Sequence, residues 1–231
     1  MKLILIRHGQ SVWNAKNLFT GWIDVELSDK GKAEAKKAGE LLKEAGIYPN
    51  ICYTSYLKRA IHTAQIALNT LGWEHIDVLR SWKLNERHYG DWQGKNKDEV
   101  KAKYGEELFM AVRRGYDTPP PPIEESEPDF EERYPIDPKY EGIGYAPKSE
   151  SLKDTRERVV EYFFEEIMPS LIVYDTVMIA AHGNSLRALI MFLEKVAPEE
   201  IHKIEIPTGV PIVYDLTQEL LIKDKIIYSH S

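Results

Sequence analysis

The sequence contains one cysteine, more acidic than basic side chains, and no apolar run long enough to cross a membrane. Cys52 cannot form an internal disulfide, and its apolar surroundings favour a buried, inert thiol. The formal net charge of −7 argues against nucleic acid and anionic membranes as partners, because both require a broad basic surface. Residues 3–6 are apolar but the run stops at Arg7, too early for a secretion signal. We therefore expect a soluble cytoplasmic protein.

At 231 residues and 43% hydrophobic composition, the chain is long enough to bury a sizeable core. Residues 116–150 hold eight of the thirteen prolines and an acidic run from Glu124 to Glu132, so no regular element is expected there. We predict a single domain over residues 1–231 with a proline-rich surface excursion at about 116–150. Loops of this length are usually functional covers or disordered, and composition does not separate the two.

Apolar runs and segments of helical periodicity alternate along the chain. Residues 3–6 and 177–181 are continuously apolar, as expected of strands that are covered on both faces in a mostly parallel sheet. A further strand is expected at 51–54, and a last one near 210–216 closes the chain. This alternation predicts an α/β fold.

Four helices are expected between these strands. The first begins after Ser28, its N-cap, and stops at Gly46. Ser55 is expected to cap the second, and Pro169 to end the third. The fourth begins after Ser185 and has apolar positions that step by three, one and three.

Two of the predicted strands end in His-Gly, at His8-Gly9 and at His182-Gly183. The carboxyl ends of strands in an open α/β sheet form a ligand crevice, so both histidines could face one ligand. A neutral imidazole is a nucleophile near pH 7, and Arg7 beside it can hold and polarise a phosphate. Glycine turns at helix N-termini offer free N–H groups to anionic oxygens. The pattern predicts phosphoryl transfer with His8 as the nucleophile.

In-line phosphoryl transfer requires several fixed cations around the transferring group. The candidates are Arg59, Arg87, Lys97, Arg113 and Arg114. Taken singly, each residue has an ordinary interpretation, since a histidine at a strand end is more often a hydrogen-bonded core residue and paired arginines often lie on a solvated helix face. The combination favours a phosphoryl-transfer site.

Seven blocks of sequence follow one another in an order typical of a known family, namely 7–14, 19–22, 58–63, 84–90, 113–115, 181–187 and 206–211. On these blocks the chain resembles the cofactor-dependent phosphoglycerate mutases, a branch of the histidine phosphatase superfamily. Arg7-His8-Gly9 alone indicates only the superfamily. The block around Glu86, the paired Arg113 and Arg114 and the proline-rich excursion are more specific to the mutase branch.

The resemblance implies a three-layer α/β/α fold of the phosphoglycerate mutase type and an isomerase of glycolysis and gluconeogenesis. It implies that 2,3-bisphosphoglycerate phosphorylates His8, which passes the phosphoryl group to a monophosphoglycerate and takes one back, so that 3-phosphoglycerate and 2-phosphoglycerate interconvert. Glu86 would be the general acid/base for the substrate hydroxyl and His182 the transition-state stabiliser, with Arg7 completing the catalytic set. No metal is implied, and the partners would be small phosphoglycerates and further copies of the chain in a dimer or tetramer.

Residue by residue, the resemblance also assigns a ligand-binding set. It comprises Arg7, His8, Gly9, Gln10, Ser11, Val12, Trp13, Asn14, Thr20, Gly21, Arg59, Glu86, Arg87, His88, Tyr89, Lys97, Arg113, Arg114, Gly183 and Asn184. Phosphoglycerates carry several negative charges, so an acidic protein binds them only where its cations converge. We therefore expect Arg59, Arg113 and Arg114 to point toward the same site as His8.

Three alternatives stay open. The same histidines, Arg7 and Glu86 would serve a phosphatase that releases phosphate to water. A non-enzymatic phosphate-binding domain would be expected to lose His8, Glu86 or His182, and the sequence keeps all three. A metal site built from His8, His88 and His182 fits no compact ligand spacing.

Two departures from the family pattern bear on the phosphohistidine. Many members continue past the last strand with a tail rich in glycine, alanine and lysine that covers the site, and this sequence stops at Ser231. We expect His8 to lose its phosphoryl group to water faster than in tailed relatives. Gln10 stands where many relatives carry glutamate, which slightly reduces the negative charge beside the phosphate.

Overall fold

A six-stranded mixed sheet lies at the centre of the fold in this computed structural model, which describes residues 1–134, 137–145 and 147–229. Its strands are β1 (Lys2–Arg7), β2 (Ile51–Thr54), β3 (Asp77–Arg80), β4 (Thr176–Ala181), β5 (Ile212–Leu216) and β6 (Ile222–Ile227). They lie in the order β3-β2-β4-β1-β5-β6. The first four in that order are parallel, and β5 and β6 are antiparallel to their neighbours. The prediction of an α/β fold with a mostly parallel sheet is confirmed.

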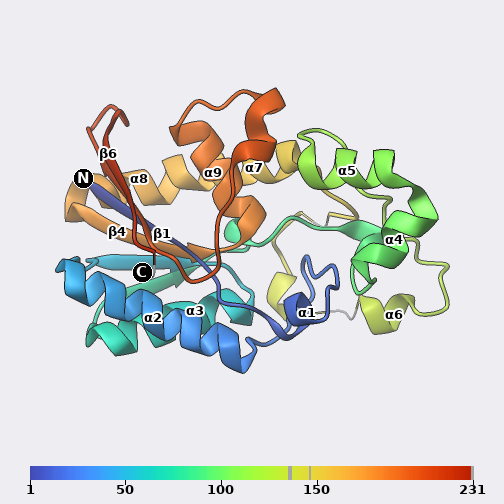
Figure 1. The fold of residues 1–231 in the computed structure, drawn as a ribbon, viewed down its shortest axis with the longest axis horizontal. Coiled ribbons are helices and arrows are strands. Elements are labelled where there is room, and N and C mark those ends of the chain that lie inside the picture. Colours follow the sequence, from blue (N-terminus) through green and yellow to red (C-terminus); the bar gives the residue numbers. More distant parts are fainter. Residues whose placement is uncertain (135–136, 146, 230–231) are drawn as a thin grey trace.

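Helices cover both faces of the sheet and make a three-layer arrangement (Figure 1). One face carries α2 (Asp29–Ala45) and α3 (Lys58–Leu71). The other carries α7 (Leu152–Tyr162), α8 (Met168–Tyr174) and α9 (Gly183–Leu193). β1 shows why its sequence is apolar throughout: Leu3 and Leu5 join the core beneath α7 and α9, whereas Ile4 and Ile6 pack with α2 and α3.

Cys52 lies in the core beneath α2 and α3 and is fully buried. Burial raises the pKa of its thiol to about 12. The thiolate, which is the reactive form, is therefore scarce at neutral pH. This agrees with the expected buried and inert thiol.

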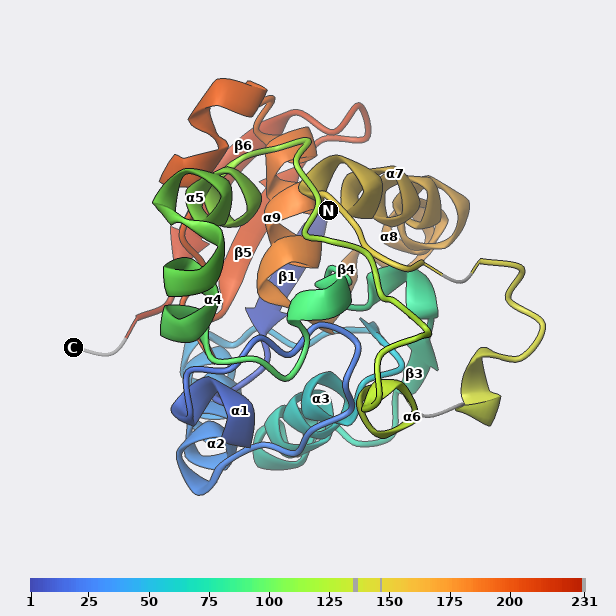
Figure 2. The ribbon, with the colours of Figure 1, turned by 90° about the vertical axis from the view of Figure 1, so that its right-hand side faces the viewer.

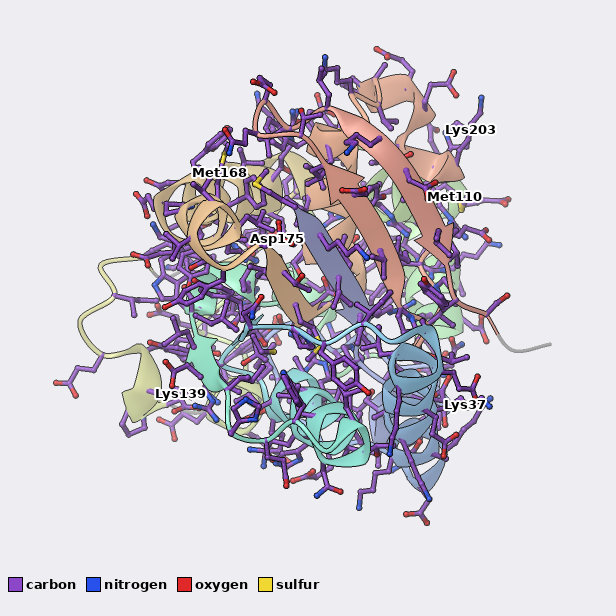
Figure 3. The ribbon with its side chains drawn as sticks, turned by 90° about the vertical axis from the view of Figure 1, so that its left-hand side faces the viewer. Lys37, Met110, Lys139, Met168, Asp175 and Lys203 are labelled. Atoms are coloured by element: carbon purple, nitrogen blue, oxygen red, sulfur yellow. The ribbon has the colours of Figure 1, made fainter. Side chains whose placement is uncertain are left out.

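The remaining elements are short. They are α1 (Val12–Ala15), α4 (Lys97–Tyr104), α5 (Glu106–Arg114), α6 (Phe130–Arg133), the 3-10 turns Trp82–Leu84, Gly90–Trp92 and Pro138–Tyr140, and the 3-10 segment Pro198–Lys203. α1, α4 and α5 lie beyond the carboxyl ends of β1 and β4, and Figure 2 views the molecule from that side. Figure 3 views the opposite end, where Asp175 precedes β4 and its carboxylate lies 3.7 Å from the N-terminal ammonium. No helix in the described ranges is long and apolar enough to span a membrane.

The helix signals were correct for α2 and wrong in three other places. Ser28 caps α2 by accepting the Gly31 N–H, and Gly46 ends it in the left-handed conformation. Ser55 does not cap α3, whose N-cap is Leu57; its hydroxyl accepts the Leu57 N–H, ahead of the helix, and bonds His182. The prediction for Ser185 was also wrong, since α9 begins at Gly183 and Ser185 lies inside its first turn.

Pro169 does not end its helix. The chain stays helical from α7 through a π-helical turn, Phe163–Ile167, into α8. Pro169 stands in the first turn of α8, directly after the π-helical turn. The expected final strand is β5, but it does not close the chain, because β6 follows it. β6 is solvent-exposed along its length, so its sequence lacks the continuous apolar run by which buried strands were predicted.

The proline-rich excursion is less irregular than predicted, because α6 and the turn Pro138–Tyr140 form within it. Residues 135, 136 and 146 of the excursion lie outside the described residues. Its middle lies against the body of the fold, where Tyr140 stacks on Trp22 with ring centroids 5.0 Å apart and Lys139 pairs with Asp24 at 2.7 Å.

Gly31 is where α2 touches the loop that carries His8. A Cβ added at Gly31 would overlap the Gln10 carbonyl oxygen and lie 2.8 Å from the Gln10 nitrogen. Gly→Ala in a helix normally stabilises by about 1 kcal/mol. Here we expect Gly31→Ala to destabilise by about 1–3 kcal/mol through overpacking, a fall of roughly 2–4 °C in Tm for each kcal/mol. Thermal unfolding measures this, with the exposed Lys32→Ala as control; an unchanged or higher Tm for Gly31→Ala would contradict the prediction.

Candidate active site

A cavity of about 440 Å³ opens at the carboxyl ends of β1 and β4. Among the described residues, six cationic side chains and only two carboxylates, Glu86 and Glu205, line it. The cations are Arg7, Arg59, Lys97, Arg113, Arg114 and Arg187. In a protein of net charge −7, this is a local concentration of positive charge suited to a polyanion.

His8 follows β1 directly and is almost completely buried. Its Nδ1 lies 2.6 Å from the Gly9 carbonyl oxygen, which can only accept, so we assign the ring proton to Nδ1. Nε2 then keeps its lone pair and accepts from Arg59 Nε at 3.4 Å. Burial, followed by the charges of Arg59 and Arg7, holds the His8 pKa well below its usual value. The ring is therefore neutral at pH 7 and keeps the lone pair that a nucleophile needs.

His182 follows β4 and lies behind His8, with ring centroids 5.0 Å apart. Its Nε2 lies 2.7 Å from Ser55 Oγ, which already accepts the Leu57 N–H and can turn its own proton to the ring. Nδ1 is buried and meets no hydrogen-bond partner among the described residues. We assign the ring proton to Nδ1, because Nε2 can accept from Ser55, which leaves Nδ1 as a donor that a ligand oxygen would satisfy.

The Arg7 guanidinium is anchored through one of its nitrogens, and a second nitrogen is unpaired among the described residues. Its Nη1 donates to the Ile206 carbonyl at 2.9 Å, whereas its buried Nε has no partner in the described part of the chain. The guanidinium passes closely over Gly183, where a Cβ would lie 3.3 Å from Arg7 Nε. Glycine at 183 thus makes room for this cation beside His8.

Arg59 is anchored in the same way. Its Nη2 donates to the Gly21 carbonyl at 2.7 Å and its Nη1 to the Ile23 carbonyl at 2.9 Å. Burial lowers the pKa of Arg59 to about 10, so the side chain stays charged at neutral pH. A guanidinium fixed on two carbonyls can meet a phosphate without reorganising.

Glu86 brings a carboxylate to this cationic site and is 9% exposed. Its Oε1 accepts the backbone N–H groups of Arg87 at 2.8 Å and Asn184 at 3.2 Å. The Asn184 N–H belongs to the first turn of α9, so this bond ties the Glu86 carboxylate to the start of the helix that follows His182. Asn184 Nδ2 also donates to the Tyr89 hydroxyl at 3.0 Å. Glu86 is placed to exchange a proton with a ligand in the cavity.

The structure brings most of the predicted site residues to the cavity wall. Those that line it are Arg7, His8, Asn14, Thr20, Gly21, Arg59, Glu86, Tyr89, Lys97, Arg113, Arg114, Gly183 and Asn184. Arg59, Arg113 and Arg114 therefore share one cavity with His8, as a polyanionic substrate requires. His182 does not line the cavity itself but lies against His8.

Seven predicted ligand-binding residues do not line the cavity, namely Gly9, Gln10, Ser11, Val12, Trp13, Arg87 and His88. Arg87 is the clearest case, since its three nitrogens donate to the carbonyls of Glu150, Val112 and Thr118. Ser11 caps α1. Arg87 and Ser11 thus hold the backbone near the cavity without forming its surface.

Six lining residues were not in the predicted set, namely Leu18, Phe19, Arg187, Glu205, Ile206 and Pro207. Arg187 could have been found, because it lies three residues after Asn184 on α9 and so on the same helix face. Glu205 carried no signal, since a lone acid before a loop looks like surface. No group of three or more His, Cys, Asp or Glu residues within the described chain is arranged to hold a metal.

Comparison with known proteins agrees with this geometry. Residues 3–135 match a family model described as the histidine phosphatase superfamily (branch 1). A curated 2,3-bisphosphoglycerate-dependent phosphoglycerate mutase of Corynebacterium diphtheriae is 55% identical over 217 residues, covering 94% of this chain and 86% of the relative. The chain belongs to the histidine phosphatase superfamily. A second mutase of this name, from Hydrogenobaculum sp., is 52% identical over 226 residues, 96% of this chain and 90% of the relative.

Solved structures of the superfamily share the fold at lower identity. An α-ribazole phosphatase from Shigella flexneri aligns with a TM-score of 0.72 and 22% identity over 99% of this chain and 96% of that one. A mycobacterial glucosyl-3-phosphoglycerate phosphatase aligns with a TM-score of 0.70 and 23% identity over 99% and 98%. At such identities the likeness shows the histidine phosphatase fold alone.

Lys97 predicts a pH dependence of anion binding. Burial, aided by the charges of Arg113 and Arg7, lowers the pKa of the Lys97 ammonium to about 8. The side chain is therefore charged below this pH and loses its charge as the pH rises through it. We expect the affinity for glycerol 3-phosphate, which stays dianionic above its second pKa of about 6, to fall roughly tenfold toward pH ~9.5, as for the loss of one charge-assisted hydrogen bond.

Calorimetric titration at several pH values measures this fall. Lys97→Arg is the matched variant, because arginine stays protonated over the whole range and should flatten the curve. A wild-type affinity that does not change between neutral and alkaline pH would contradict the assignment of Lys97 as a titrating ligand.

Proposed function

We propose that this protein is a 2,3-bisphosphoglycerate-dependent phosphoglycerate mutase that interconverts 3-phosphoglycerate and 2-phosphoglycerate. The observation that carries the proposal is a neutral, buried histidine whose Nε2 meets a cavity lined by six cations. The mutase relatives are identical to this chain at more than half of the aligned positions, which supports the same activity. The reaction belongs to glycolysis and gluconeogenesis.

The residues of the cavity fit 2,3-bisphosphoglycerate. The donors Arg7 Nε and His182 Nδ1 lack a partner in the described ranges and would each be satisfied by a phosphate oxygen. The outer cations Lys97, Arg113 and Arg114 would hold the second phosphate or the carboxylate. When bound, the bisphosphate supplies the phosphoryl group that primes His8.

In the proposed reaction, His8 Nε2 attacks phosphorus and forms the P–N bond while the P–O bond to the glycerate oxygen breaks. Arg7, Arg59 and His182 stabilise the charge on the equatorial oxygens, since in-line transfer depends mainly on fixed positive charge. Glu86 gives its proton to the leaving oxygen and removes one from the hydroxyl that attacks phosphohistidine in the return step. His8 Nδ1 keeps its proton on the Gly9 carbonyl throughout.

The remaining assignments are proposed together with this function. We propose that the 231 residues act as one phosphoglycerate mutase-like domain and that Arg7, His8, Glu86 and His182 are catalytic. The lining residues would bind the phosphoglycerates directly, and the seven predicted residues that do not line the cavity would act through them. A homo-oligomer, dimer or tetramer, and a cytoplasmic location are proposed by analogy with the mutases.

The first test separates a mutase from a phosphatase. We expect conversion of 3-phosphoglycerate to 2-phosphoglycerate that is strongly stimulated by 2,3-bisphosphoglycerate. The same residues would also support hydrolysis, so released phosphate is measured in parallel. Phosphate release without isomerisation would reject the mutase in favour of a phosphatase.

A second test follows the phosphoryl group to His8. Incubation with 2,3-bisphosphoglycerate labelled in its phosphates should leave acid-labile label on the wild type, and His8→Asn should take up none and lose at least about 10³-fold in isomerisation rate. The control is His62→Asn, which changes a partly exposed histidine paired with Glu26 and should be labelled like the wild type. Label that persists on His8→Asn would refute His8 as the nucleophile.

A further inference from the structure

The backbone that carries Glu86 has no regular structure to hold it. Glu86 lies in the stretch between the 3-10 turns Trp82–Leu84 and Gly90–Trp92, with no helix or strand of its own. A general acid or base must nevertheless stand within hydrogen-bond reach of its proton acceptor or donor. Other parts of the chain must therefore fix this stretch.

Arg158 of α7 donates to carbonyls of this stretch and of the 3-10 turn before it. Its Nη1 donates to the carbonyl oxygens of Lys83 at 2.8 Å and Asn85 at 3.0 Å, and its Nη2 to that of Glu86 at 2.9 Å. Trp22 Nε1 donates to the same Glu86 oxygen at 2.6 Å. One rigid guanidinium thus orients three carbonyls on the approach to the catalytic carboxylate.

Glu150 holds Arg158 in this position. The carboxylate is fully buried and accepts Arg158 Nε on Oε2 and Arg158 Nη2 on Oε1, both at 2.9 Å. Oε1 also accepts the His88 N–H at 2.9 Å, and the Glu150 N–H donates to the His88 carbonyl at 2.9 Å. The pair therefore grips the chain on both sides of Glu86.

Neither Arg158 nor Glu150 lines the cavity. A buried ion pair is by itself a weak source of stability, because desolvation offsets the attraction of the charges. Its directional bonds here converge on the residues flanking one side chain, Glu86. The pair thus has a role that packing alone does not explain.

We propose that Arg158 and Glu150 are positioning residues that fix the Glu86 carboxylate for proton transfer. The inference rests on the proposed acid/base role of Glu86. It predicts that loosening the pair slows the chemical step and leaves substrate binding nearly unchanged, since the cations of the cavity are anchored elsewhere.

Arg158→Lys tests the proposal, because lysine keeps the charge but cannot bond three carbonyls and a carboxylate at once. We expect kcat to fall by about 10-fold to 100-fold, as for a small misplacement of a catalytic group, with KM within about twofold of the wild type. The matched control is Arg156→Lys, two residues earlier on α7, where the arginine bonds the Tyr116 hydroxyl and should leave both constants unchanged. A wild-type kcat in Arg158→Lys would overturn the proposal.

A double-mutant cycle with Glu86→Gln shows whether the effect passes through Glu86. If Arg158 acts through this carboxylate, Arg158→Lys should add little to the loss already caused by Glu86→Gln. Independent effects that multiply in the double variant would overturn the proposal, even where Arg158→Lys alone is slow. Far-ultraviolet circular dichroism and thermal unfolding check that each variant is folded.

Glu150→Gln carries the same cycle if Arg158→Lys does not fold, because the amide keeps the volume of the carboxylate but loses its charge. The cycle can be read on isomerisation or on phosphate release, whichever the wild type performs. A wild type that only releases phosphate would reject the mutase assignment. The role of Arg158 would still be decided separately, by the coupling between Arg158→Lys and Glu86→Gln in the phosphate-release rate.

Discussion

The site depends on guanidinium groups that are fixed on backbone carbonyls before any anion arrives. Arg7 is held on the Ile206 carbonyl, Arg59 on those of Gly21 and Ile23, and Arg187 on that of Ile204. Six cations in one cavity repel one another, and an acidic protein has no excess of positive charge to spread over its surface. Anchoring to carbonyl dipoles keeps them together, so that little reorganisation is needed when a phosphate binds.

The same cations set the state of the two histidines. His8 and His182 are buried next to Arg59 and Arg7, so desolvation and positive charge both hold their pKa values low. A neutral His8 keeps the lone pair that nucleophilic attack needs. A phosphorylated His8 would in turn place negative charge where the cations are densest, so one arrangement favours both attack and the covalent product.

Guanidinium groups outside the cavity perform a related structural task. Arg87 bonds three carbonyls from separate parts of the chain, and Arg158 bonds three within and just before the stretch that carries Glu86. Both also contact Glu150, the last residue of the proline-rich excursion. Tyr145 of the excursion donates to the Glu150 carboxylate as well, so this segment is tied to the support of Glu86 although none of its described residues lines the cavity.

The sequence by itself determined the elements whose signals are local. A continuous apolar run predicted β1 and β4, and Ser28 and Gly46 marked the ends of α2, because burial on two faces and helix capping depend on neighbouring residues. The His-Gly pairs located the cavity because they follow two strands, and the carboxyl ends of strands in an open α/β sheet form a ligand crevice. Five of the lining cations were predicted, both from what phosphoryl transfer requires and from the resemblance, namely Arg7, Arg59, Lys97, Arg113 and Arg114.

Only the tertiary structure decided which polar side chains reach the cavity. Arg87 and Arg187 both lie in family blocks, yet Arg87 is bound to backbone carbonyls and Arg187 lines the cavity. Ser55 had the local pattern of a helix cap, but its hydroxyl bonds His182 from a strand far along the chain. A hydrogen-bonding group takes the partner that folding brings within reach, and here the partners lie far apart in the sequence, Ser55 with His182 and Arg87 with Val112.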